Sequence, residues 1–179
     1  MREITQDELN ERIRKHRIWL EDKTNPDAMR LVLTGYNLSH SNLSNSNLSK
    51  SDLSRSNLSN SNLRYSNLRY SNLSNTDLRH SCLRYSNLSY SNLSSSNLSY
   101  SDLRYADLSG SNLDYAAWPL WCGSVDVTID ERIAKQLLYH ALSVALPHTP
   151  KRAITKTLIK WANGFHRVGE VPELKVEVK

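Results

Sequence analysis

The chain has 179 residues and a net charge of +5, which fits one soluble domain with attached segments. No apolar run approaches the ~20 residues that span a bilayer and the chain does not begin like a signal peptide, so we expect a cytoplasmic protein with no membrane partner. The cysteines Cys82 and Cys122 lie far apart without a CxxC spacing, which argues against a disulfide framework or a zinc knuckle.

An amphipathic helix is predicted near the start of the chain. Thr5-Gln6-Asp7-Glu8 has the pattern of a capping box, in which two side chains each accept a backbone N–H. Core-type residues follow at helical spacing, namely Leu9, Ile13, His16 and Leu20. We predict a helix from about Thr5 to Glu21, ended by Asn25-Pro26, and assign residues 1–30 to an N-terminal capping helix.

Leucine then recurs at every fifth position from Leu38 to Leu113, which makes sixteen positions without a substitution. Five is neither the strand period of two nor the helical period of 3.6, so no single strand or helix holds these leucines on one side. A chain that turns a corner every five residues does so, if four pentapeptides complete a coil. Each Leu then points to the axis and stacks on the Leu twenty positions later, as in the column Leu38, Leu58, Leu78 and Leu98.

The residues around each Leu follow a pattern of their own. The position two before Leu is nearly always Ser, with Thr76 and Ala106 as small variants, so we expect a cramped inward site whose hydroxyls bond backbone carbonyls. The position just before Leu is Asn or Asp except at Cys82, which suggests a corner, because both residues tolerate tight turns. The two residues after Leu vary, and we expect both to face outward.

This pattern resembles the pentapeptide-repeat family, whose motif is Ala-(Asp/Asn)-Leu-x-x, and the likeness covers residues 36–115. The resemblance implies an all-β solenoid, a right-handed quadrilateral (four-sided) β-helix, in a bacterial protein. The chain departs from the motif by placing Ser where the family has Ala. We assign residues 31–118 to this β-helix, beginning at Leu31-Val32-Leu33.

Residues 119–179 differ in composition and are predicted to form a small, mainly helical C-terminal cap or dimerisation region. Trp118 takes the next Leu position and is expected to plug the axis. Residues 125–129 alternate like a short strand, and Thr128-Ile129-Asp130-Glu131 is a second capping box. The helix after it is expected to bury one apolar face, made of Ile133, Leu137, Ala141 and Val144.

Two further elements are predicted towards the end of the chain. A helix starts near Pro150 and stops at Gly164, and the alternating residues 174–178 suggest an edge strand. Apolar faces in this region suggest a homodimer through the C-terminal end, as members of the family often form. A folded cap on a monomer explains the same residues.

We expect no catalytic or metal site and no cofactor, and hence no enzyme. Serine is abundant, but no GxSxG elbow and no glycine-rich phosphate loop is present. His40 and His80 share a column two coils apart, about 10 Å at the spacing of stacked strands, which is too far to share a metal. The other histidines suggest packing or turn positions, namely His16, His140, His148 and His166.

The candidate binding face comes from sorting outward residues into columns twenty positions apart. One side carries Arg64, Tyr65, Arg84, Tyr85, Arg104 and Tyr105, and the next adds Arg69, Tyr70 and Tyr90. Arginine and tyrosine are common interface anchors, but stacked tyrosines also stabilise a sheet surface by themselves. Both interpretations stay open. Regular Ser and Asn rows on another side could order water, although an ice-binding face favours stiffer β-branched residues.

We therefore expect a non-catalytic binding scaffold whose partner is a protein. Some members of the family imitate duplex DNA and modulate bacterial type II topoisomerases, which requires a strongly negative surface. The repeat of this chain instead has seven Lys or Arg against five Asp or Glu. Weak nucleic-acid binding through the Arg/Tyr side and the stripe Arg152, Lys156 and Lys160 is a further alternative, although nucleic acid is not the expected partner.

Overall fold

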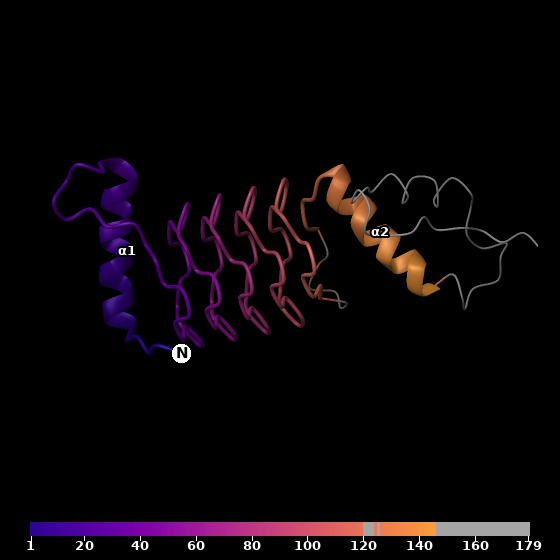
Figure 1. The fold of residues 1–179 in the computed structure, drawn as a ribbon, viewed down its shortest axis with the longest axis horizontal. Helices are drawn as coiled ribbons and strands as arrows, with labels where there is room; N and C mark the ends of the chain where they lie inside the picture. Colours follow the sequence, from indigo (N-terminus) through magenta and orange to yellow (C-terminus); the bar gives the residue numbers. More distant parts are fainter. Residues whose placement is uncertain (120–123, 125, 146–179) are drawn as a thin grey trace, which may run out of the picture. The chain divides into compact units, whose positions relative to one another are not determined.

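The computed structural model describes residues 1–119, 124 and 126–145, with side chains up to residue 138. The chain forms two compact units, Met1–Thr128 and Ile129–Lys179. The described residues contain helix α1, Gln6–Glu21, in the first unit and helix α2, Glu131–Ala145, in the second (Figure 1). Within this described part of the chain, neither helix is long and apolar enough to cross a membrane.

Helix α1 begins as the capping box predicts. The Thr5 hydroxyl oxygen accepts from the Glu8 backbone N–H at 3.2 Å, and a Glu8 carboxylate oxygen accepts from the Thr5 backbone N–H at 3.0 Å. The helix ends at Glu21, where the N–H of Asp22 donates to the Ile18 carbonyl at 2.7 Å. Leu9 and His16 are buried, so the predicted inner face is confirmed at these two positions.

The repeat segment winds into a solenoid with twenty residues per coil. Parallel bridges join residue i to residue i+20 along four ladders, which begin at Val32, Asn37, Asn42 and Asn47. We number the sides by their first complete repeats, so that sides 1 to 4 contain Leu38, Leu43, Leu48 and Leu53, with equivalent residues at twenty-residue intervals. The four-sided arrangement predicted from the leucines is therefore confirmed, and successive coils stack as parallel turns (Figure 1).

Each pentapeptide contributes a single bridge residue, so the repeat within 32–117 consists of isolated bridges where continuous strands would be expected of an all-β fold. Side 1 gives the pattern. The N–H of Leu38 donates to the Asn57 carbonyl at 2.7 Å, and the N–H of Asn57 donates to the Tyr36 carbonyl at 2.9 Å. A turn follows at once, closed by the N–H of Ser41 on the Leu38 carbonyl at 3.2 Å. Turning every five residues leaves no room for a longer ladder.

The leucines form one continuous core. All sixteen from Leu38 to Leu113 are at most 5% exposed, and Leu33 extends the same register by one repeat. Burying a Leu side chain stabilises a fold by about 2 kcal/mol, so this column is the main source of stability. Because each coil contacts only its neighbours, that stability is distributed along the solenoid axis and the end coils have the fewest partners.

The corner lies at a different residue from the one predicted. The second residue after each Leu, from His40 to Tyr115, has a positive φ, which is 56 to 61° in the fifteen cases other than Gly110. The Asn or Asp before Leu instead occupies the bridge, and its side-chain oxygen accepts the N–H of the first residue after Leu, as Asn37 does from Ser39 at 3.2 Å. The preference for Asn and Asp therefore reflects this side-chain hydrogen bond, which holds the start of the turn.

The serines two before Leu point inward, as predicted. Seven of them donate to the carbonyl of the Leu three residues earlier at 2.6 or 2.7 Å, which removes the penalty of burying a hydroxyl. The expectation that both residues after Leu face outward is wrong at Ser54 and Ser89, which are 8% and 4% exposed. Their hydroxyls fold back onto the side-chain oxygens of Asp52 and Asn87 at 2.7 and 2.6 Å.

Side chains of α1 bond the backbone edge of the first coil. The Gln6 amide accepts from the N–H of Asn42 at 2.9 Å and donates to its carbonyl at 3.0 Å, which reproduces both bonds of a backbone bridge. His16 Nε2 contacts the Ser49 carbonyl at 2.9 Å, and Nδ1 accepts from the N–H of Leu31 at 3.1 Å. Since Nδ1 is the acceptor, His16 is neutral with its proton on Nε2. His16 is therefore a buried packing residue, as expected, and it also forms hydrogen bonds through both ring nitrogens.

The described C-terminal residues alter several expectations. Trp118 takes the next Leu position but is only partly buried, so it does not close the end of the solenoid axis completely, contrary to the prediction. Among the described residues of 125–129, only Thr128 makes a bridge, with Asp107. Thr128 therefore does not cap α2; Asp130 does, accepting from the N–H of Ile133 at 2.9 Å.

In α2 the predicted face is confirmed at Ile133, which is fully buried, whereas Leu137 is only partly buried and Gln136, which was not predicted to face inward, is buried. The side chains of Ala141 and Val144, the helix predicted over 150–164 and the strand over 174–178 lie outside the described residues.

Candidate functional site

All nine residues of the predicted Arg/Tyr face lie on two adjacent sides of the solenoid. Arg64, Arg84 and Arg104 directly follow the leucines of side 2, and the bridges from Asn62 to Cys82 and from Cys82 to Asp102 place them in one row. The tyrosine after each arginine occupies the corner between sides 2 and 3. Arg69, Tyr70 and Tyr90 lie on side 3, so the structure brings the predicted set together as two rows parallel to the solenoid axis.

The tyrosine rings stack at the spacing of the coils. The ring centroids of Tyr65 and Tyr85 are 5.0 Å apart and those of Tyr85 and Tyr105 are 4.8 Å apart, with planes within 8° of parallel. On side 3, the rings of Tyr70 and Tyr90 stack at 5.2 Å. These five side chains remain 41–53% exposed. The stacked rings therefore form regular, partly exposed rows.

Arginines lie over these rings. The guanidinium carbon of Arg64 is 5.5 Å from the Tyr65 ring centroid and that of Arg84 is 5.7 Å from the Tyr85 centroid. Contacts of this kind are worth about 0.5–1 kcal/mol at exposed sites. A hydrogen bond with the Tyr65 hydroxyl raises the pKa of Arg64, so this group stays charged.

Arg69 joins both tyrosines of side 3. Its guanidinium carbon lies 4.7 Å from the Tyr70 centroid and 5.1 Å from the Tyr90 centroid, and its Nη2 donates to the Tyr70 hydroxyl at 3.1 Å. Tyr90 in turn covers Gly110, because a Cβ added at Gly110 would lie 2.8 Å from the Tyr90 ring. The stack on side 3 therefore ends at a residue that leaves room for the last ring.

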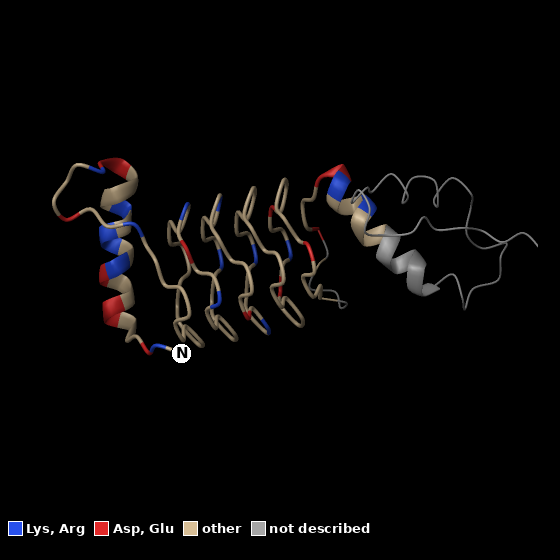
Figure 2. Cartoon of the chain, viewed as in Figure 1, with Lys and Arg blue, Asp and Glu red and all other residues tan. Residues whose placement is uncertain are grey.

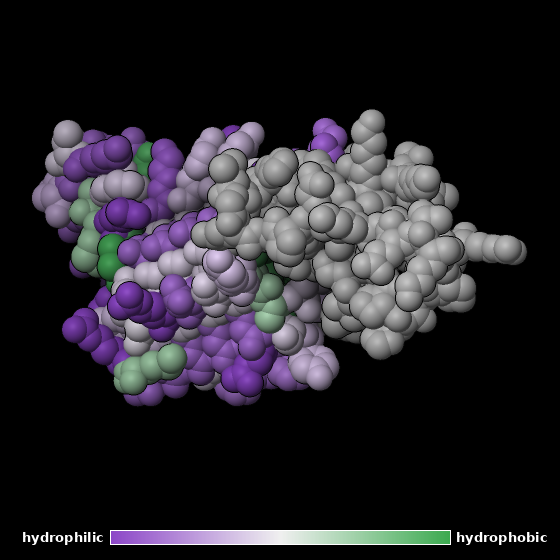
Figure 3. Space-filling model, turned by 45° about the vertical axis from the view of Figure 1, so that its right-hand side comes forward, coloured by the Kyte–Doolittle hydropathy of each residue, from purple (hydrophilic) through white to green (hydrophobic). Residues whose placement is uncertain are grey.

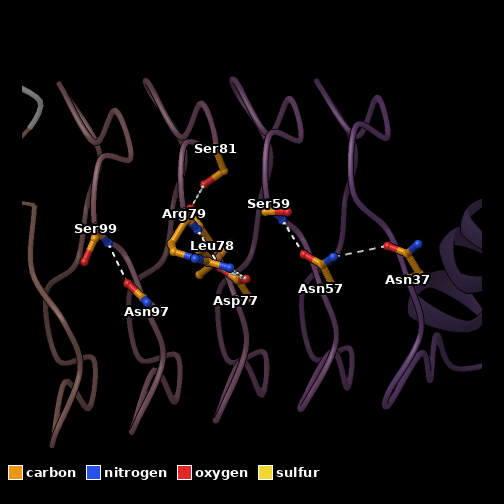
Figure 4. A network of polar contacts seen from close by, with 9 residues as sticks. All are labelled: Asn37, Asn57, Ser59, Asp77, Leu78, Arg79, Ser81, Asn97 and Ser99. Carbon is orange, nitrogen blue, oxygen red and sulfur yellow. Dashed lines mark hydrogen bonds and ion pairs between the residues drawn. The ribbon is translucent and has the colours of Figure 1, made fainter. Parts of the chain in front are cut away.

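Arg104 differs from the other two arginines of its row. Its guanidinium bonds both carboxylate oxygens of Asp102, at 2.9 and 2.6 Å. The hydrogen bond from Arg104 lowers the pKa of Asp102, and the same bond raises the pKa of Arg104. Arg79 on side 1 pairs in the same way with Asp77, two residues earlier (Figure 4). These two arginines are neutralised within their own repeats.

Cys82 is the part of the site that the sequence reasoning did not include. It occupies the position where Asp102 supports Arg104, but a thiol cannot supply the carboxylate oxygens, and the buried Nε of Arg84 has no hydrogen-bond partner. The signal was present in the sequence, because Cys82 is the one departure from Asn or Asp before Leu. Among the described residues, no ion pair is formed by Arg64, Arg69 or Arg84.

Tyrosine occupies strained backbone positions throughout this region. Tyr65, Tyr70, Tyr85, Tyr90 and Tyr105 all have φ between 57 and 61°. The left-handed region costs roughly 1–2 kcal/mol for a residue with a Cβ other than Asn or Asp. Asn60 and Asn75 hold the same turn position with a side chain better suited to it. Tyrosine is therefore not what the turn itself favours.

Charge is distributed unequally among the sides. In residues 36–115, sides 2 and 3 carry five Lys or Arg against two Asp, whereas sides 1 and 4 carry two Arg against three Asp. Figure 2 shows the basic residues recurring from coil to coil, and in Figure 3 the visible surface of the first unit is mainly hydrophilic. Sides 2 and 3 therefore form the cationic half of the solenoid, with a net charge of +3 against −1.

The other sides hold their polar side chains in internal contacts. On side 1, the Asn57 amide donates to the Asn37 side-chain oxygen at 3.3 Å (Figure 4). The His80 ring on the same side stacks on Tyr100 at 5.0 Å. His40 lies two coils before His80 in the same column. The described residues contain no cluster of three metal-binding side chains. Arg152, Lys156, Lys160 and the histidines at 148 and 166 lie outside them.

A model of known protein families identifies this repeat. The model described as pentapeptide repeats matches residues 32–64, 56–94 and 83–114, and those residues contain the uninterrupted leucine register and the twenty-residue coils. Residues 32–114 consist of pentapeptide repeats. The four-sided solenoid expected from the resemblance is present in this segment, where parallel bridges join residues twenty apart.

Solved structures of other pentapeptide-repeat proteins are similar to this chain. Rfr23 from the cyanobacterium Cyanothece 51142 is 31% identical, with a TM-score of 0.39, over 57% of this chain and 63% of Rfr23, less than two thirds of that protein. Alr5209 from Nostoc PCC 7120 is 28% identical, with a TM-score of 0.36, over 56% of this chain and 86% of its own. The plasmid-mediated fluoroquinolone resistance protein QnrB1 is 18% identical, with a TM-score of 0.24, and the match covers 64% of this chain and 72% of QnrB1. No curated protein matches in sequence.

Proposed function

We propose that this pentapeptide-repeat protein is a non-catalytic scaffold that binds another protein through its Arg/Tyr face. The observation that carries the proposal is the set of exposed tyrosines packed against Arg64 and Arg84, which form no ion pair within the described part of the chain. Every repeat has this positive φ, so the turn itself requires it, but Asn satisfies the same turn with less strain than tyrosine, and the turn alone therefore does not explain the tyrosines. Tyrosine and arginine also supply much of the binding energy in known protein interfaces.

The regular backbone favours this role. Bridges and turn hydrogen bonds fix the position of each side chain along the axis, so a partner would meet an ordered surface. A preorganised surface loses less conformational entropy on binding, which raises affinity for the same contacts. The solenoid also presents its sides as long flat surfaces, which repeat proteins commonly use for recognition.

Both ends are proposed to act as caps. Helix α1 is suited to this at the N-terminal end, because Gln6 bonds both backbone groups of Asn42 and thereby occupies an edge that could pair with another chain. For residues 119–179 we propose a C-terminal cap or a homodimer contact. Multi-angle light scattering tests the dimer, which a strict monomer at high concentration would exclude.

Modulation of a type II topoisomerase by DNA mimicry is the alternative for this family, and the charge of the chain argues against it. A DNA mimic must occupy a site built for phosphates and therefore needs a strongly negative surface. Sides 2 and 3 are net positive instead, and sides 1 and 4 are close to neutral. We expect gyrase supercoiling to be unchanged by micromolar protein, and inhibition would favour the alternative.

Protein capture from a bacterial lysate tests the proposed function. The wild-type chain is compared with the variant R64S/R84S and with R55S/R79S, which removes the same charge from sides 4 and 1. We expect a protein retained by wild type and R55S/R79S but lost with R64S/R84S, in the presence of nuclease. Retention of the same proteins by all three would show that the Arg/Tyr face is structural only. Binding that disappears with nuclease would point to nucleic acid.

A further inference from the structure

The side chains of the Arg/Tyr face repeat at the spacing of the coils, and this spacing favours partners whose own side chains repeat at the same distance. Neighbouring tyrosines of the side 2 row are 5.0 and 4.8 Å apart, and the arginines beside them follow the same coils. The three arginines therefore span about 10 Å, which is two coil steps at the usual spacing of paired strands. A partner that contacts every coil must carry its own groups at this repeat.

An α-helix lying along the solenoid axis meets this requirement. Residues at i, i+3 and i+7 lie on one helix face, and they advance by 3.5 residues per step on average, which at 1.5 Å per residue is about 5.2 Å. Same-side residues of an extended strand are about 6.7 Å apart, and each strand of duplex DNA carries a phosphate every 3.4 Å. Neither of these stays in step with the coils.

The charge of the face specifies the helix further. Arg64, Arg69 and Arg84 have aromatic contacts but form no ion pair among the described residues. Guanidinium groups bind carboxylates through two parallel hydrogen bonds, as Arg104 already does with Asp102. The tyrosine row beside them offers ring edges and hydroxyls to neighbouring side chains of the same helix.

We infer that the Arg/Tyr face docks an acidic α-helix of a partner protein, aligned with the solenoid axis, whose carboxylates are spaced as i, i+3 and i+7 so that neighbouring ones meet Arg64 and Arg84. The inference rests on the proposed function and adds the chemistry and geometry of the partner. Two helical turns cover the three arginines, so a short segment is sufficient. Because the coil spacing is fixed by backbone hydrogen bonds, the helix must match the face.

Two labelled peptides of the same composition test this geometry against the full-length protein. One places glutamates at i, i+3 and i+7 on a single face, and the other distributes them around the helix, with equal helical content verified by circular dichroism. Fluorescence anisotropy is expected to give at least about tenfold tighter binding for the aligned peptide. The difference should persist with R55S/R79S and be lost with R64S/R84S.

A third variant gives an independent readout. Cys82→Asp places a carboxylate beside Arg84, in the position from which Asp102 neutralises Arg104, and is expected to weaken the aligned peptide severalfold without removing an arginine. Equal affinity for both peptides, or no effect of R64S/R84S, would overturn the helix inference. Tighter binding of a twelve-nucleotide single strand than of either peptide would overturn it as well. Capture of a protein that depends on Arg64 and Arg84, together with equal peptide affinities, would leave the proposed function standing and reject only the helix.

Discussion

Arg84 follows Cys82 in the register in which Arg104 follows Asp102, and only the second pair forms an ion pair. The two repeats are one coil apart on the same side and carry a thiol and a carboxylate at equivalent positions. In the fifteen other repeats, the side-chain oxygen of the Asn or Asp before Leu accepts the backbone N–H of the residue after Leu, as Asp102 does from Arg104 at 3.2 Å. Cys82 interrupts both contacts.

Replacing Cys82 with Asp is therefore expected to stabilise the solenoid. The introduced carboxylate would accept the Arg84 backbone N–H and pair with its guanidinium, and it would also repel Asp102, its bridge partner in the next coil. The net gain in the free energy of unfolding is therefore expected to be at most about 1 kcal/mol. Urea denaturation measures the change, with Cys82→Ala as the control that supplies neither contact. A variant no more stable than this control would contradict the interpretation of Arg84. A stabilising substitution that weakens binding would also explain why a carboxylate is absent there.

Much of this organisation could be predicted from the sequence because it follows from the spacing of the leucines. Once sixteen leucines recur at intervals of five, residues twenty apart must be neighbours, and Arg64, Arg84 and Arg104 fall into one row without further information. The capping box at Thr5 was equally local, since its four residues contain both halves of the interaction. Local patterns and exact repeats leave little for tertiary contacts to decide.

The errors have a common physical origin, because several residues suit more than one role. Asn and Asp favour left-handed turns, yet here they cap the turn from the bridge and leave the positive φ to residues such as Tyr65. Thr128 fits a helix N-cap, but the ladder recruits it to pair with Asp107 and Asp130 becomes the cap. The loss of a contact at Arg84 could be seen only once the Asp102 pair supplied a reference.

Two buried serines should behave differently when truncated to alanine. The Ser91 hydroxyl has no hydrogen-bond partner among the residues that the structure describes, whereas the Ser86 hydroxyl donates to the Leu83 carbonyl at 2.7 Å. Ser91→Ala is expected to be neutral or stabilising, and Ser86→Ala to cost about 1 kcal/mol. Thermal or urea unfolding of the two variants gives the comparison. Equal destabilisation would mean that Ser91 has a partner in solution, such as a buried water.

Stability should decline in mild acid because of His16. Burial lowers the pKa of this residue, and its Nδ1 accepts the Leu31 N–H, so the folded protein holds the ring neutral. The unfolded chain takes up a proton below its ordinary pKa of about 6.5 while the folded chain does not, so stability is full above that pH and falls below it. The maximum slope is about 1.4 kcal/mol per pH unit for this one proton.

Urea midpoints between pH 8 and pH 5 measure the effect, with His16→Gln as the comparison. The pH dependence in this range should be smaller in the variant, even if the variant is less stable overall. Hydrogen exchange should localise the loss to Leu31 and to the α1 contacts of the first coil. Identical pH profiles for the variant and the wild type would exclude His16 as the cause.

Gly110 is expected to be coupled to Tyr90. Fifteen other residues adopt a similar φ with a side chain, so the backbone alone does not require glycine at this turn. The Tyr90 ring does, because an added Cβ would approach it to 2.8 Å. Gly110→Ala should therefore cost more stability in the wild-type background than with Tyr90→Ala, by about 1 kcal/mol in a double-mutant cycle. Additive effects would show that the ring moves aside freely.

The twenty-residue coil also determines which changes in length this protein tolerates. Inserting one pentapeptide preserves the leucine core and every turn, since each repeat forms the same bonds. The insertion nevertheless rotates everything after it by a quarter turn, so arginines and tyrosines of side 2 would continue into the Asn and Ser rows of another side. Inserting four pentapeptides lengthens the Arg/Tyr rows and leaves both ends unchanged. Selection for the leucine core alone permits insertions in multiples of five residues, whereas selection for the Arg/Tyr face permits insertions only in multiples of twenty.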